Sequence, residues 1–199
     1  MAPLSYKTLF AAGVALLGAS GVAAQCKPAE VNKATMDLVT QWEEWYDQPQ
    51  TNAAGVWVVG YSHYCVDEAC SDVTYPFPIS RDDGRELLNA DMANSEICIS
   101  KHTSPSITLN GNQFGALVSW AYNIRCPLAS DSDLIRRLNN GETPKDVVEQ
   151  ELPKWKFAGG IELPGLSRRR WAEINLFNTE TQDPGLPMEC EGLNVEIGI

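Results

Sequence analysis

Residues 42–65 read WEEWYDQPQTNAAGVWVVGYSHYC, and this stretch decides the fold. Apolar side chains recur every three or four positions over residues 31–45, which predicts an amphipathic helix. Residues 48–55 contain proline, asparagine and glycine, which are typical of loops. Residues 56–64 are rich in β-branched and aromatic side chains, which favours a short strand or hairpin arm. The stretch therefore predicts a helix, a loop and a small hairpin in that order.

The remainder of the chain is predicted to be mostly helical. Ser80 and Asp83 form a capping pattern that begins a helix, and Pro144 occupies a first helical position. Pro127 should end the apolar segment before it, because proline donates no backbone hydrogen bond. Helices are expected over residues 80–95, 109–124, 134–138, 144–152 and 166–177. One small hairpin among helices predicts an α+β architecture.

The first residues have the pattern of a secretory signal peptide. Lys7 supplies a positive charge, residues 9–22 form an apolar core, and residues 22–24 (Val-Ala-Ala) form a cleavage site. A membrane anchor is the alternative, but glycines interrupt the apolar run, which is shorter than the ~20 residues that span a bilayer. We therefore expect residues 1–24 to be removed and residues 25–199 to form a single secreted domain.

Six cysteines follow the signal segment, and an even number in a secreted chain predicts three disulfides. Six cysteines allow 15 pairings. The expected pairs, one because it closes a small loop and two by elimination, are Cys65–Cys70, Cys98–Cys126 and Cys26–Cys190. The last pair would pin a tail over residues 183–199. A metal site with His63 is the weaker alternative, so we expect no metal and no cofactor.

The net charge of −11 disfavours nucleic acids and anionic membranes as partners. The loss of Lys7 with the signal segment would make the remainder still more acidic. Acidity also suits anionic bacterial walls poorly, and a neutral glycan such as chitin or an acidic working pH would relieve the repulsion. Solubility of a secreted protein is a sufficient alternative explanation. We expect a monomer whose partner is a polysaccharide.

Four segments, in order, resemble the phage-type lysozymes (glycoside hydrolase family 24) of the secreted fungal kind. They are residues 42–45 (WEEW), 55–63 (GVWVVGYSH), 112–123 (NQFGALVSWAYN) and 163–173 (LPGLSRRRWAE). The resemblance covers nearly all of the chain after the signal segment. It implies a lysozyme-like α+β fold, in which a sugar cleft separates a small hairpin lobe from a helical lobe.

The resemblance assigns the catalytic general acid to Glu43, which must keep its proton until it donates it to the leaving oxygen. The family's second carboxylate falls at Asn52, and an amide cannot accept a proton from water. The family's water-holding threonine falls at Val58, which has no hydroxyl. Two usual glycines are replaced by Glu44 and Ser62. One of three usual catalytic side chains therefore remains.

Asp47 is a candidate replacement for the missing carboxylate. It lies one turn past Glu43 on the predicted helix. A carboxyl pair about 6.5–9.5 Å apart would permit hydrolysis with inversion. The alternative is a solvated aspartate at the end of a helix.

The resemblance also implies roles for several residues around the catalytic position. His63 should pair with Asp91 in a structural contact, and Arg169 should pair with Glu43. Tyr122 and Asn123 match an aromatic–amide pair that binds sugar, although core packing is an alternative for Tyr122. The remaining implications are interhelical salt bridges of Arg170 and Glu173, and a position beside the cleft for Arg125, which replaces a usual glycine.

The leading functional hypothesis is a secreted lysozyme-type endoglycosidase. It would hydrolyse β-1,4 bonds of amino-sugar polymers, peptidoglycan or chitin, with catalysis impaired at Asn52 and Val58. The alternative is a non-catalytic secreted glycan-binding protein or effector that keeps the cleft. A disulfide-stabilised scaffold that recognises a protein is a third, weaker hypothesis.

Overall fold

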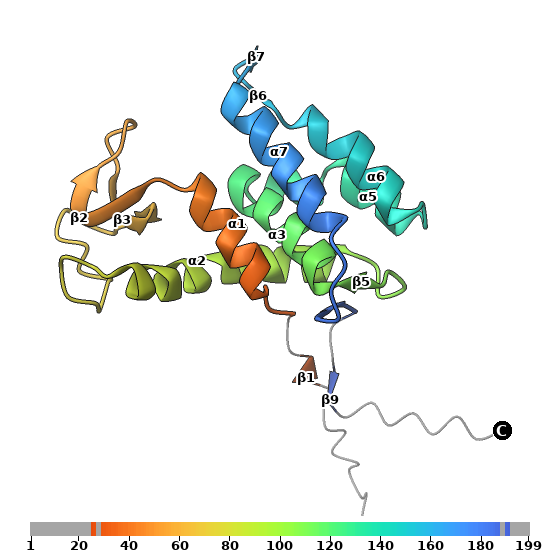
Figure 1. The fold of residues 1–199 in the computed structure, drawn as a ribbon, viewed down its shortest axis with the longest axis horizontal. Coiled ribbons are helices and arrows are strands. Elements are labelled where there is room, and N and C mark those ends of the chain that lie inside the picture. Colours follow the sequence, from red (N-terminus) through yellow and green to blue (C-terminus); the bar gives the residue numbers. More distant parts are fainter. Residues whose placement is uncertain (1–24, 27–28, 188–189, 192–199) are drawn as a thin grey trace, which may run out of the picture.

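A computed structural model describes residues 25–26, 29–187 and 190–191 (Figure 1). The predicted signal segment, residues 1–24, lies outside this described part. The fold is α+β, as predicted, with a hairpin lobe and a helical lobe. The hairpin lobe holds strands β2 (Trp45–Thr51), β3 (Trp57–Tyr61) and β4 (His63–Tyr64), which form one antiparallel sheet in the order β2-β3-β4.

The first predicted helix is shorter than expected. Helix α1 (Lys33–Trp42) ends because Glu43 has an extended backbone, with φ −92° and ψ 140°. Trp45 does not continue the helix but pairs with Tyr61 across the sheet. Residues 48–51, predicted as loop, belong to the edge strand β2, where Pro49 is tolerated. Pairing with β3 therefore outweighs both the helical spacing and the local turn preference.

Helix α2 (Arg81–His102) connects the lobes, since it packs on β3 in one and on α3 and α4 in the other (Figure 1). It begins as predicted, with the Ser80 hydroxyl accepting a hydrogen bond from the Asp83 N–H at 3.0 Å. Gly84 allows the close approach to the sheet, because a Cβ there would lie 2.5 Å from the Trp45 ring. The helix continues past the predicted end near residue 95, because its last turns are buried against the helical lobe.

Helix α3 (Gly111–Ile124) is the centre of the helical lobe, and almost all of its first ten residues are buried. Its apolar side chains, with Trp120 against Trp155 at 5.5 Å, form the main core. The elements around it are α4 (Cys126–Ser130), α5 (Asp133–Asn139), α6 (Pro144–Glu151), η1 (Leu152–Lys154) and α7 (Pro164–Phe177). Helices α5, α6 and α7 follow the predicted segments to within a few residues, and Ser132 caps α5. Helix α4 was not predicted, and Pro127, expected only to end the preceding helix, lies in its first turn, where a proline is tolerated.

Three short antiparallel pairs complete the described part. They are β1 (Gln25–Cys26) with β9 (Cys190–Glu191), β5 (Leu109–Asn110) with β8 (Pro184–Leu186), and β6 (Phe157–Ala158) with β7 (Ile161–Glu162). The predicted disulfides Cys65–Cys70 and Cys98–Cys126 are present. Cys26 and Cys190 are register partners in the β1–β9 pair, and their disulfide stays a prediction. Among the described residues, no helix has the length and apolar character needed to span a membrane.

Candidate active site

Glu43 leaves the end of α1 and reaches α7. Its backbone N–H donates to the Val39 carbonyl at 3.1 Å, which closes the last helical turn. Its Oε1 accepts a hydrogen bond from Nη1 of Arg169 at 2.8 Å, as the resemblance implied. The Glu43 side chain is 17% exposed, so it is partly buried but open to a ligand. Its other oxygen, Oε2, has no hydrogen-bond partner among the described residues.

Arg169 is buried and connects three helices. Besides Glu43 on α1, its guanidinium lies 3.3 Å from Oε1 of Glu173 and donates to the Ser119 carbonyl of α3 at 3.4 Å. Burial raises the pKa of Glu173, while the guanidinium groups of Arg169 and Arg170 oppose that shift. Arg169 therefore fixes the Glu43 carboxylate to a rigid, charged part of the core.

Arg170 and Glu173, expected to take part in interhelical salt bridges, form an ion pair with each other within α7. Arg170 Nε lies 2.8 Å from Oε2 of Glu173, three residues along the same helix. The contacts between helices are made by other groups. Ser119 on α3 donates to Glu173 at 2.8 Å, and Arg170 Nη2 donates to Oδ1 of Asn123 at 3.0 Å.

Tyr122 and Asn123 lie near the end of α3, where Asn123 contacts Arg170 of α7. Burial is the largest cause that raises the pKa of Tyr122, followed by the charges of Asp91 and Glu43. The charges of Arg125 and Arg169 lower it. The charges of the site therefore act on the Tyr122 hydroxyl, whereas the side-chain oxygen Oδ1 of Asn123 already accepts a hydrogen bond from Arg170. The predicted sugar contacts of both residues remain predictions.

Asn52 organises the β2–β3 turn. Its Oδ1 accepts hydrogen bonds from the N–H groups of Ala54 and Val56 at 2.9 and 3.0 Å. Its backbone N–H donates to the Val56 carbonyl at 2.9 Å. Val58 is fully buried in β3. Asn52 therefore stabilises the turn through hydrogen bonds, and Val58 stabilises the strand through its burial, in place of the family's catalytic groups.

Asp47 lies in strand β2 and is exposed, so its expected position one helical turn past Glu43 is wrong. The chain between them is extended, and four extended residues span up to ~13 Å between Cα atoms. Asp47 therefore does not lie beside Glu43 as it would on the next turn of a continuous helix.

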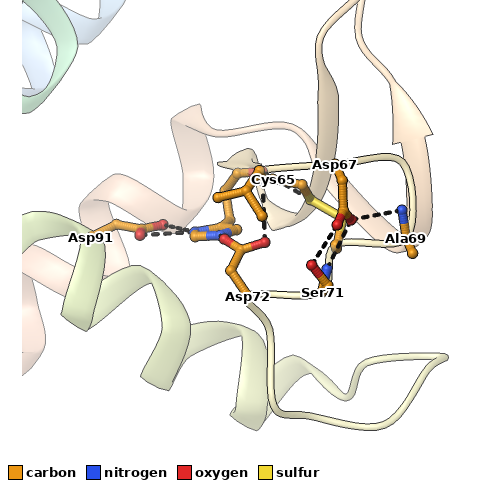
Figure 2. The surroundings of a disulfide bond; sticks show 9 residues. Cys65, Asp67, Ala69, Ser71, Asp72 and Asp91 are labelled. Carbon is orange, nitrogen blue, oxygen red and sulfur yellow. Dashed lines mark hydrogen bonds and ion pairs between the residues drawn. A yellow bond between two sulfur atoms is a disulfide. The ribbon is translucent and has the colours of Figure 1, made fainter.

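His63 binds two carboxylates, one of which the sequence did not indicate. Its Nδ1 lies 2.9 Å from Asp91 of α2, the predicted partner, and its Nε2 lies 2.9 Å from Asp72. Figure 2 shows Asp91 reaching the ring from the helix and Asp72 from the segment just after the loop that the Cys65–Cys70 disulfide closes. The hydrogen bond to Asp91 is the main cause that raises the pKa of His63 to about 9. The imidazolium therefore connects the hairpin lobe to α2 at neutral pH.

Glu44 and Ser62, which replace two usual glycines, contact each other beside the site. The Ser62 hydroxyl donates to the Glu44 carbonyl at 3.0 Å, and Ser62 has a left-handed φ of 63°. The Tyr46 hydroxyl donates to the Glu44 carboxylate, which raises the pKa of Tyr46 to about 12. These substitutions therefore add polar contacts to the turn.

Arg125 is a second functional candidate. The resemblance implied a position beside the cleft for it but gave no reason for an arginine in place of the usual glycine. Its backbone has φ 77° and ψ 148°, a region that is essentially restricted to glycine and costs other residues about 1–3 kcal/mol. Its guanidinium carbon lies 5.1 Å from the centroid of the Tyr64 ring on β4. An exposed cation–π contact returns about 0.5–1 kcal/mol. Stability alone does not explain an arginine here.

Two hollows on the described surface lie away from Glu43. One of about 700 Å³ is bordered by Asn32, by β5 and by β8. The other, of about 220 Å³, lies beside Trp171 of α7. Neither is bordered by Glu43 or Arg169, although Arg170 borders the second, so the candidate site is identified by its chemical groups and not by the volume of a hollow.

Comparison with known proteins identifies the family. The family model described as phage lysozyme matches residues 40–173, from α1 to Glu173. The chain is 34% identical over 125 residues to an endolysin of Bacillus phage PZA, a match that covers 63% of this chain and 45% of that protein. The chain thus spans less than half the length of this relative.

Solved structures have the same fold. The muramidase domain of SpmX from Asticaccaulis excentricus superposes with a TM-score of 0.63 and 25% identity, covering 76% of this chain and 99% of that one. An endolysin from Escherichia coli O157:H7 phage FAHEc1 superposes with a TM-score of 0.62 and 22% identity, covering 77% and 96%. The family match includes Glu43, Tyr122, Asn123 and Arg169. The chain therefore belongs to the phage lysozyme family.

Proposed function

We propose that this protein binds peptidoglycan and slowly hydrolyses its β-1,4 glycosidic bonds, with Glu43 as the general acid. The observation that carries the proposal is the 2.8 Å hydrogen bond from Arg169 to Oε1 of Glu43. It orients a partly buried carboxyl group whose Oε2 has no partner among the described residues. Homologous endolysins and a muramidase domain support the same class of substrate.

In the proposed reaction, Oε2 of Glu43 would donate its proton to the leaving glycosidic oxygen. A water molecule would attack the anomeric carbon from the opposite face, which gives inversion of its configuration. The proton of that water would pass to solvent. Arg169 would position the carboxyl group without touching the reacting atoms. Tyr122 would contact a sugar beside Glu43.

The proposed turnover is slow because water activation is weak. A general acid or base contributes typically ~10²–10⁴-fold to the rate. The Asn52 amide oxygen is occupied by two backbone N–H groups, and Val58 offers no hydroxyl. Asp47, exposed on β2, does not lie one helical turn from Glu43, so the proposed reaction assigns the proton of the attacking water to solvent.

A non-catalytic glycan-binding protein is the second candidate. The turn-stabilising hydrogen bonds of Asn52 favour it, because they give this residue a use that has no connection with hydrolysis. In this function Glu43 would bind a sugar hydroxyl, and no bond would break.

One experiment separates the two functions. Turbidity loss of bacterial walls and release of chitin oligomers are measured for the wild type, Glu43→Gln and Asn52→Asp. Activity in the wild type that Glu43→Gln abolishes supports the enzyme and excludes the non-catalytic protein. Activity that appears only in Asn52→Asp excludes the native enzyme. Preference for walls or chitin identifies the glycan.

We also propose that the protein is secreted as a monomer of residues 25–199, like the secreted fungal lysozymes that it resembles. The signal pattern of residues 1–24 supports this, as do two disulfides, which persist in oxidising compartments. Protein recovered from culture medium should begin at Gln25 by amino-terminal sequencing and elute as a monomer in size-exclusion chromatography. Recovery only from cells, with residues 1–24 retained, would contradict secretion.

A further inference from the structure

The strained backbone at Arg125 is held in place from both sides. Its N–H donates to the Ala121 carbonyl at the end of α3, and its carbonyl accepts from the Ala129 N–H of α4. The next residue, Cys126, is joined by a disulfide to Cys98 of α2. Glycine would adopt φ 77° and ψ 148° without strain, and an exposed cation–π contact returns less than the strain costs. The arginine side chain therefore has a use other than stability.

The Arg125 guanidinium connects the lobes beside the candidate active site. It reaches from the end of α3 to the Tyr64 ring on β4, which is 53% exposed. It also lies close enough to Tyr122 for its charge to lower the pKa of that hydroxyl. Tyr122 in turn responds to the charge of Glu43. Arg125 also lies two residues past Asn123, whose side chain accepts a hydrogen bond from Arg170, and the adjacent Arg169 binds Glu43. The cation and the ring thus border the proposed path of a glycan past Glu43.

The charge of Arg125 is not neutralised. Among the described residues it forms no ion pair, whereas the neighbouring cations Arg169 and His63 bind Glu43 and the pair Asp72 and Asp91. The chain as a whole carries a net charge of −11, so its general field repels anions. A free guanidinium on an exposed aromatic ring is consequently a local anion site.

We propose that Arg125, seated on Tyr64, binds a carboxylate substituent of the glycan and selects carboxylate-bearing amino-sugar polymers over neutral ones. A guanidinium binds a carboxylate through two parallel hydrogen bonds, and the tyrosine ring offers an apolar face to a sugar. The stem peptides of peptidoglycan carry carboxylates, and chitin carries none. This inference rests on the proposed function, since it requires a glycan to lie beside Glu43.

The test measures binding in a Glu43→Gln background, where hydrolysis does not interfere. The probes are soluble peptidoglycan fragments with free stem-peptide carboxylates, the same fragments with those carboxylates amidated, and chitin oligomers. The free carboxylates should improve the dissociation constant roughly tenfold, as a charge-assisted hydrogen bond does. Arg125→Gln should abolish this preference, and added salt should shrink it. Arg125→Lys should keep part of it, because lysine has the charge without the planar fork.

Arg81→Gln is the matched control, because Arg81 is another exposed guanidinium on an aromatic ring of the hairpin lobe, 4.1 Å from the centroid of Trp45. It should leave the preference intact. Arg125→Gly, which relieves the backbone strain, should fold and lose the preference. A preference that survives Arg125→Gln overturns the inference, as does tighter binding of all three probes by that variant or no binding of any probe by the parent. Absence of hydrolysis by native protein contradicts the proposed enzyme and leaves this binding measurement intact.

Discussion

At the scale of single residues, substitution of Arg169 should strongly lower the stability of the folded protein. Arg169→Gln would leave the carboxylates of Glu43 and Glu173 without their shared cation. Breaking a buried ion pair costs about 3–5 kcal/mol, so the free energy of unfolding should fall by about that amount in urea titrations. Hydrolysis and glycan binding should fall with it. Arg168→Gln, at the exposed neighbouring position, should change stability by no more than about 0.5 kcal/mol. Equal effects of the two substitutions would contradict the role assigned to Arg169.

The structural role of Asn52 in the β2–β3 turn can be tested separately from any role in catalysis. Asn52→Ala removes the acceptor for the N–H groups of Ala54 and Val56 and should destabilise the protein by about 1–2 kcal/mol. Asn52→Asp keeps an oxygen acceptor at the same position and should retain most of that stability. Thermal unfolding of both variants measures the difference. An alanine variant as stable as the wild type would show that the turn does not depend on this side chain.

At the scale of elements, sequence patterns predicted helices correctly where nearby residues determine the conformation. They failed where pairing with another strand determines it. Ser80 was recognisable as a helix cap, because a cap depends on residues two or three positions away. Trp45 fitted the helical spacing, but its pairing with Tyr61 across the sheet decided its conformation. The Asp47 hypothesis was wrong about position for the same reason.

His63 makes the attachment of β4 and its disulfide-closed loop to α2 depend on pH. Its pKa rises from an ordinary value near 6.5 to about 9, chiefly through its hydrogen bond to Asp91 and then through Asp72. A raised pKa means that the folded state binds the proton more tightly. The resulting stability is complete below about pH 6.5 and is lost as pH rises through about 9. The maximum loss is of the order of 3 kcal/mol.

Urea unfolding at pH 6 and pH 9.5 measures this dependence. His63→Gln should flatten it over that range. The chain has only one other histidine, the exposed His102, so His102→Gln is the matched control and should keep the wild-type dependence. An unchanged pH dependence in His63→Gln would place its source elsewhere.

At the scale of the whole molecule, the order of segments identified the family and one contact between lobes, His63 with Asp91, while other long-range contacts could not be predicted from the sequence. Four segments aligned with a known order, so Glu43, Asn52 and Arg169 could be assigned by position. The contact of His63 with Asp72 depends on the path of the loop after β4, and that of Arg125 with Tyr64 depends on how the helical lobe lies against the hairpin lobe. No local pattern encodes that arrangement. The residues in which this chain departs from its family are consequently the ones whose environment only the structure shows.

The two described disulfides should contribute unequally to the stability of the whole molecule. Cys65–Cys70 closes a loop within the hairpin lobe over a sequence separation of 5, whereas Cys98–Cys126 joins α2 to α4 over a separation of 28. In the chain-entropy model these loops correspond to about 2 and about 3.6 kcal/mol. Replacing both cysteines of each pair with serine should reproduce that order in urea unfolding. Because Cys126 follows Arg125, loss of Cys98–Cys126 should also release the strained backbone there and weaken the preference for carboxylate-bearing glycan, while loss of Cys65–Cys70 should not. The reverse order would show that the hairpin lobe, and not the junction of the helices, limits stability.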